Sequence, residues 1–112
     1  MRKNNLHIFL DKNRVVYKSE ALLNTQHAEW EPVVTSLQRL CKGDIHRRLF
    51  IMVGDDDDVR EGETACKIGG CETSFRELMD AAKTGRTFLL ERRNDAKRGG
   101  ILSVVECVYL DD

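Results

Sequence analysis

Four consecutive aspartates, residues 55–58, come one glycine after a run of five apolar residues. Carboxylate oxygens are the ligands that calcium prefers, and a bound cation relieves the repulsion among adjacent negative charges. Residues two apart in an extended chain point the same way, so Asp55 and Asp57 are the first candidate metal ligands. Asp58 and Glu63 are further candidates in the same loop. The alternative is a solvated acidic loop that also discourages edge-to-edge pairing of sheets.

The acidic segment does not have the pattern of an EF-hand loop. Counting from Asp55, Arg60 occupies the position that requires glycine, and Cys66 occupies the position of the bidentate glutamate. Calcium takes about six to eight oxygen ligands, which two or three carboxylates from one loop do not supply. The sequence therefore predicts a weak calcium site here at most.

A second charged segment lies nearer the C-terminus and is basic. Clustered lysines and arginines attract the phosphate groups of anionic lipids, so this segment is the candidate lipid-binding site. The alternative is the charged tip of a hairpin, because Glu91 and Asp95 lie among the bases. The basic residues of the cluster are Arg92, Arg93, Lys97 and Arg98.

No catalytic arrangement can be argued from spacing. The three histidines show no paired spacing for a metal or a catalytic dyad. The glycine pairs at 69–70 and 99–100 lack the pattern of a dinucleotide-binding turn or a P-loop. The sequence therefore predicts a binding protein and not an enzyme.

Composition predicts a single globular domain spanning residues 1–112. Hydrophobic residues make up 41% and charged residues 33%, which is typical of a globular domain with a solvated surface. The net charge of −1 gives no overall field that would attract nucleic acid, so no nucleic-acid partner is expected. No apolar run is long enough to span a membrane, and the one after Asn5 is too short for a signal peptide.

The four cysteines include no Cys-x-x-Cys pair, which favours free thiols in a reducing compartment and hence a cytoplasmic protein. Cys41 and Cys107 lie in apolar surroundings and are predicted to be small core residues. Cys66 and Cys71 flank the first glycine pair and are candidates for exposed thiols.

The apolar pattern predicts mostly β-strands. The first two strands look like a hairpin, because a polar turn at 11–13 separates them. The third is apolar throughout, which predicts a central strand buried on both faces. The expected strands are Leu6–Leu10, Val15–Ala21, Leu49–Val53, Lys67–Thr73, Thr87–Glu91 and Ile101–Leu110.

One helix has a clear start and stop. Ser74 and Glu77 have the spacing of a capping box, and Gly85 supplies the stop, which predicts a helix from Phe75 to Lys83. Residues 32–42 fit either a short strand at Val33–Thr35 followed by one helical turn, which we favour, or a complete helix. The expected fold is an all-β antiparallel sandwich with one short helix near residues 75–83. The alternative is an α+β sheet with two helices on one face.

The order of these segments resembles that of C2 domains, especially those of copines. Ser36 to Asp44 is similar to the copine stretch "slqqLCngD", and Leu49 to Asp57 is similar to the strand that enters the third calcium loop. The resemblance covers about residues 6–110 and rests on the order of short motifs. The other matching segments are Val15–Glu20, Trp30-Glu31-Pro32, Lys67-Ile68-Gly69, Thr73–Leu78 and Gly99–Leu102.

The resemblance implies an eight-stranded sandwich that binds anionic phospholipid membranes in a calcium-dependent way, as a cytoplasmic protein peripheral on membranes. Asp55 and Asp57 match the paired aspartates of the third calcium loop. The sequence departs from the family at three places. No counterpart of the first strand and first calcium loop precedes Leu6, Cys66 stands where an acid is expected, and His27-Ala28 replaces the usual Asn-Pro.

These departures motivate an alternative function without ions. A sandwich that lacks its first strand leaves a sheet edge open, and an open edge is a template for strand addition. On this alternative the chain is a structural or interaction domain that binds a protein partner or forms a homodimer through that edge.

Overall fold

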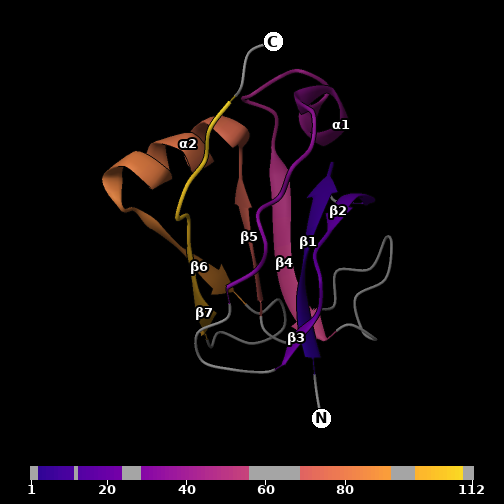
Figure 1. Cartoon of the computed structure of the whole chain (residues 1–112), viewed down its shortest axis with the longest axis vertical. Helices are drawn as coiled ribbons and strands as arrows, with labels where there is room; N and C mark the ends of the chain where they lie inside the picture. The colour runs from indigo at the N-terminus through magenta and orange to yellow at the C-terminus, as the bar shows by residue number, and fades with distance from the viewer. Residues whose placement is uncertain (1–2, 12, 24–28, 56–68, 92–97, 110–112) are drawn as a thin grey trace.

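The computed structural model describes residues 3–11, 13–23, 29–55, 69–91 and 98–109, and two helices and seven strands form within them (Figure 1). None of these helices is long and apolar enough to cross a membrane. The strands are β1 (Lys3–Leu10), β2 (Arg14–Lys18), β3 (Leu22–Leu23), β4 (Leu49–Asp55), β5 (Gly69–Thr73), β6 (Thr87–Glu91) and β7 (Arg98–Ser103). The helices are α1 (Leu37–Cys41) and α2 (Phe75–Thr84).

All the strand pairings are antiparallel, as the sequence predicts. Six strands lie in the order β2-β1-β4-β5-β6-β7, and the short β3 pairs with the start of β1. The predicted hairpin is confirmed by the pairing of β1 with β2. The predicted central position is confirmed as well, because β4 lies between β1 and β5. Burial on both faces is not, because Leu49, Ile51 and Val53 are buried whereas Phe50 and Met52 on the other face are only partly buried.

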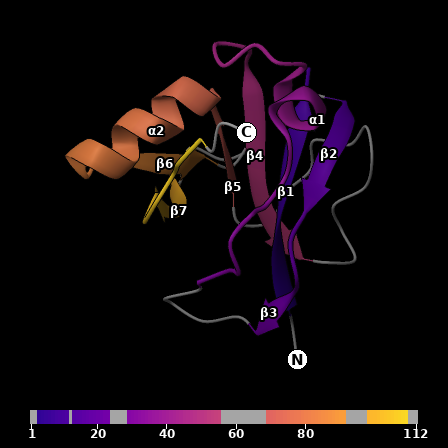
Figure 2. The ribbon, with the colours of Figure 1, turned by 45° about the horizontal axis from the view of Figure 1, so that its top comes forward.

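The described strands form one open sheet and not the two packed sheets of the predicted sandwich. β5 and β6 are joined by a single residue pair, Gly70 and Glu91. Beyond this junction the hairpin of β6 and β7 lies to one side of β1 and β4, next to α2 (Figure 2). The prediction of a strand at Val33–Thr35 is wrong: this segment has no regular structure, and Val34 is 89% exposed. Pro32 has no amide to donate to a ladder, which disfavours a strand here.

One hydrophobic core joins the sheet to both helices. Ile8 pairs with Ile51 and Leu10 with Leu49, and alternation along the strands places these four side chains on one face. α1 adds Leu40 and Cys41 to this cluster, and α2 packs Phe75 and Leu78 against it. Both helices therefore lie on the same face of the sheet, as the alternative α+β prediction required.

Helix α2 begins and ends as the sequence predicts. The Ser74 hydroxyl accepts a hydrogen bond from the Glu77 amide at 3.2 Å. Gly85 takes a left-handed conformation with φ 80° and donates its amide to Ala81 at 2.9 Å. The helix extends one residue beyond the predicted end, to Thr84.

Helix α1 confirms the predicted helical turn but includes only part of residues 32–42. The Ser36 hydroxyl accepts from the Arg39 amide at 3.1 Å and so caps the helix start. Lys42 ends the helix in a left-handed conformation with φ 56°.

The last strand starts and ends earlier than expected. β7 ends at Ser103, and residues 104–109 are not in a strand, although the apolar pattern predicted one to Leu110. Val105 and Val108 are 81% and 59% exposed, so this part of the pattern does not mark a buried strand.

Candidate functional site

Both charged segments of the sequence are flanked by residues at the same end of the sheet, which we term the loop end. β4 ends there at Asp55 and β6 ends there at Glu91. β5 and β7 begin at this end, at Gly69 and Arg98. The four strands are neighbours, and Figure 1 shows these ends at the bottom of the sheet. The topology thus brings the boundaries of the acidic segment and of the basic segment together.

Of the predicted calcium ligands, the structure describes only the backbone of Asp55. This residue closes β4 and pairs in register with Asn4 of β1. Asp57, Asp58 and Glu63 lie outside the described residues. Within the described ranges, no three His, Cys, Asp or Glu side chains are grouped so that they could hold a metal ion. The described residues alone do not fit a calcium cage, so a site there depends on residues 56–68.

Of the predicted lipid-binding residues, the structure describes only the backbone of Arg98. It opens β7 and pairs in register with Glu91, the last residue of β6. Arg92, Arg93 and Lys97 lie outside the described residues.

The glycine pair that follows the acidic loop has a structural role. Gly69 has φ +150°, and a Cβ atom built on it would lie 2.9 Å from the carbonyl carbon of Leu90. A Cβ on Gly70 would lie 3.0 Å from the Ile51 carbonyl oxygen. Both positions therefore lie where the backbones of neighbouring strands approach closely, and a side chain at either would collide with them.

The outermost hairpin exposes apolar side chains on one side. Leu89 is 43% exposed and pairs with Ile101, which is 64% exposed. On the other side of the same strand, Phe88 and Leu90 are buried. We call Leu89 and Ile101 the outer apolar pair. Sequence reasoning missed it, because a strand with apolar residues at successive positions does not reveal which ones face solvent.

A cavity of about 630 Å³ that is broadly open to solvent lies between β2 and α1. Basic side chains line it, among them Arg39 and Lys42 of the α1 region and Arg14 of β2. The sequence analysis did not identify this site. Arg39 lies in α1 and Lys42 follows its last residue, so these two are close in sequence, but only the fold brings Arg14 to them.

The described cysteines are free of disulfides. Cys41 is buried, as predicted, and burial raises the pKa of its thiol. Cys71 is not the exposed thiol that the sequence suggested, because it packs against the core, and burial raises its pKa to about 11. Cys107 is half-buried, and burial raises its pKa too. Cys66 lies outside the described residues. The three described thiols are therefore poor nucleophiles.

Comparison of the sequence with models of known protein families finds no match.

Proposed function

We propose that this chain is a non-enzymatic binding module, a copine-like C2 domain that attaches to anionic phospholipid membranes through its loop end. The observation that carries the proposal is the shared position of Asp55, Gly69, Glu91 and Arg98 at one end of the sheet. The acidic run and the basic cluster, which the resemblance and the lipid chemistry single out, are both attached there.

The two charged segments have opposite tasks in this proposal. Arg92, Arg93, Lys97 and Arg98 attract headgroup phosphates, with about 1 kcal/mol for each base close to an anionic surface. The acidic run repels the same surface unless its charge is neutralised. Calcium held by Asp55 and Asp57, with Asp58 and Glu63 nearby, would supply that neutralisation. Attachment is therefore expected to be weak without calcium and weak at high salt.

The finer fold and the location of the protein belong to the same proposal. We propose that the sheet folds over between β5 and β6, where a single residue pair joins the two strands, so that its two parts approach the layers of a sandwich. The free thiols of the described cysteines Cys41, Cys71 and Cys107 agree with a reducing compartment. We propose a cytoplasmic protein that is peripheral on membranes.

Vesicle co-sedimentation tests the membrane proposal. Vesicles of phosphatidylcholine with phosphatidylserine should pellet the protein with calcium and release it with chelator or high salt. Asp55→Asn with Asp57→Asn should abolish the calcium effect, and the change of Arg92, Arg93, Lys97 and Arg98 to glutamine should abolish pelleting. Lys83→Gln, which removes one exposed charge from α2, is the control and should behave like the parent chain. The proposal is contradicted if the protein pellets equally with pure phosphatidylcholine vesicles, or if it does not pellet with the anionic vesicles when calcium is present.

A second candidate function, strand addition at β7, is favoured by the outer apolar pair. Among the described strands β7 pairs only with β6, so its other side has no strand beside it. An edge strand with an exposed apolar side chain such as Ile101 is a template for another strand. We propose a second copy of this chain as the partner.

Sedimentation velocity over a range of protein concentrations tests this second candidate. The parent chain should dimerise and Ile101→Lys should stay monomeric. The matched control is Val34→Lys, because Val34 is exposed but lies outside the sheet. A parent chain that is monomeric at all concentrations rules out the homodimer.

A further inference from the structure

We propose that the cavity between β2 and α1 binds an anion that carries phosphate groups. Its volume of about 630 Å³ is large enough for a small organic ligand. Leu10, Val15 and Val16 of the first hairpin form its apolar part, and Leu10 is almost fully buried. The polar part of the lining consists of Ser36, Gln38 and three exposed basic residues, namely Arg14, Arg39 and Lys42. No carboxylate is among the lining residues.

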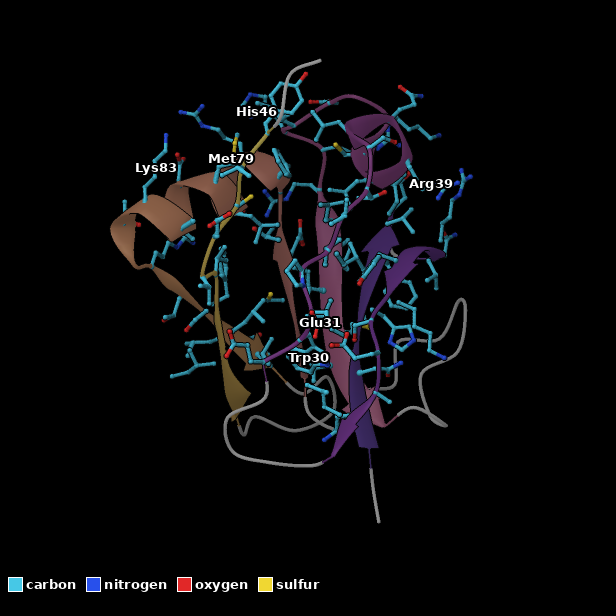
Figure 3. All side chains as sticks on the ribbon, in the orientation of Figure 1. Trp30, Glu31, Arg39, His46, Met79 and Lys83 are labelled. Carbon is cyan, nitrogen blue, oxygen red and sulfur yellow. The ribbon has the colours of Figure 1, made fainter. Side chains whose placement is uncertain are left out.

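The three basic side chains are available to a ligand. Arg14, Arg39 and Lys42 form no ion pair with any residue in the described ranges. Other described arginines, by contrast, are engaged: Arg47 binds Asp11, and Arg48 binds two glutamates. In Figure 3 the labelled Arg39 extends from α1 toward solvent at the side of the molecule.

Asp11 is a carboxylate that interacts with the charges of Lys42 and Arg14, and it already forms an ion pair with another base. Arg47 Nη2 donates to Asp11 Oδ2 at 2.6 Å. This hydrogen bond lowers the pKa of Asp11, with weaker contributions from the charges of Lys42 and Arg14. Asp11 therefore stays ionised within reach of the cavity, but its charge is matched by Arg47. The three lining cations then leave a net positive charge at the cavity.

Phosphate is the anion that this arrangement fits best. A guanidinium presents paired N–H donors that match two phosphate oxygens. Arg14 and Arg39 supply two guanidinium groups, one from β2 and one from α1. Lys42 adds a compact charge of the kind that commonly binds phosphate. The apolar side chains of Val15 and Val16 give a non-polar portion of an organic phosphate a surface to contact.

The cavity is separate from the loop end. β1 runs from Asn4, which pairs with Asp55 at the loop end, to Leu10, which lines the cavity. Six residues of strand span about 20 Å, which is more than twice the Debye length of about 8 Å at physiological salt. A ligand in the cavity is therefore expected to bind without calcium and without the loop end, so this inference goes beyond the proposed function.

Isothermal titration with inorganic pyrophosphate, in the presence of chelator, tests the inference. The parent chain should bind saturably, with an affinity that falls as salt rises. The combined change Arg14→Gln, Arg39→Gln and Lys42→Asn should weaken binding at least tenfold. Asparagine is chosen because it tolerates the left-handed conformation of Lys42, so the variant should keep its fold. A thermal melt superimposable on that of the parent verifies this.

The matched control is Lys83→Gln, which removes an exposed charge from α2, well away from Arg39 (Figure 3). It should bind pyrophosphate like the parent. Failure of the parent to bind, or an equal loss in the control, overturns the inference. Because chelator removes calcium, a failure here leaves the vesicle result at the loop end unaffected, and the reverse also holds.

Two further probes identify the source of the phosphate. Soluble inositol trisphosphate represents a free ligand, and vesicles with phosphatidylinositol bisphosphate present the same groups on a lipid. Binding of both, lost together in the triple variant, assigns the cavity to a lipid headgroup. Binding of the soluble probe alone assigns it to a free organic phosphate. Binding of either probe that persists in the triple variant contradicts the site.

Discussion

Arg48 joins the sheet to helix α2 through Glu77. Its Nη1 donates to Glu77 Oε1 at 3.2 Å, and its Nε donates to Glu72 Oε1 of β5 at 2.9 Å. The Thr73 hydroxyl donates to the other carboxylate oxygen of Glu77 at 3.1 Å. One helical carboxylate is therefore held by the residue before β4 and by the last residue of β5.

Glu77→Gln should flatten the acid dependence of stability. Burial opposes ionisation of Glu77, but the hydrogen bonds from Arg48 and Thr73 outweigh it, so the pKa of Glu77 is lowered. The folded chain then binds fewer protons than the unfolded chain, and this stabilisation is present above the unfolded pKa and lost as pH falls through the folded pKa. The side chain is a third exposed, so the contribution is expected to be below about 1 kcal/mol.

Urea denaturation at pH 7 and at pH 3.5 measures this effect. The parent should lose more stability between the two values than Glu77→Gln does. In an Arg48→Gln background the difference should shrink, which makes a double-mutant cycle the control. Parallel pH profiles for the parent and Glu77→Gln would contradict the assignment.

Gly69→Ala should destabilise the sheet much more than Gly85→Ala. At Gly69 the new Cβ would lie 2.9 Å from a backbone carbon of β6, and φ is +150°. At Gly85 φ is +80° and no atom lies within 4 Å of the new Cβ. The cost at Gly85 is expected to be about 1–2 kcal/mol, from the left-handed backbone alone. The free energy of unfolding of both variants checks this, and equal losses would argue against the close approach of β5 and β6.

Leu90→Ala and Leu89→Ala separate the two sides of β6. Leu90 is 4% exposed, and its truncation should cost about 2–4 kcal/mol of unfolding free energy. Leu89 is 43% exposed and its truncation should cost less than about 1 kcal/mol. Chemical denaturation at low protein concentration, where chains do not associate, gives both values. A larger loss at Leu89 would reverse the assigned faces.

Cys71 should react slowly with iodoacetamide at neutral pH. With a pKa of about 11, only about a thousandth of the thiol is ionised at pH 8. Between pH 7 and 9.5 its labelling rate, followed by peptide mapping, should rise about tenfold per pH unit without reaching a plateau. The buried Cys41 should react more slowly still, because it is fully covered. A plateau near pH 8.5 for Cys71 would show an exposed, ordinary thiol.

Local signals in the sequence were sufficient for most of the individual elements. Ser74 and Gly85 determine the ends of α2 through hydrogen bonds within a few residues. The local sequence was therefore enough to predict both ends of this helix. The apolar run of β4 predicted its central position, because a strand with neighbours on both sides is the most buried in a sheet. How the strands assemble depends on distant pairings such as Gly70 with Glu91, which no local pattern contains.

Some features of the candidate sites could likewise be predicted from the sequence, and others required the fold. Charge runs are visible in the sequence, so the acidic and basic segments could be named before the fold was known. Their shared position at the loop end could not be predicted, because it follows from the order of the strands in the sheet. The cavity could not be predicted from the sequence either, because Arg14 lies close to Arg39 and Lys42 only where the fold places β2 beside α1.

The position of β1 has a consequence during synthesis of the chain. β1 pairs with β4 from Leu10 to Asn4, and the last of these pairs joins Asn4 to Asp55. The nascent chain must therefore reach residue 55 before its first strand can find this neighbour. Until then Ile8, Phe9 and Leu10 lack the neighbouring strand that later covers them, and exposed apolar surface of this kind makes an incomplete chain prone to aggregate.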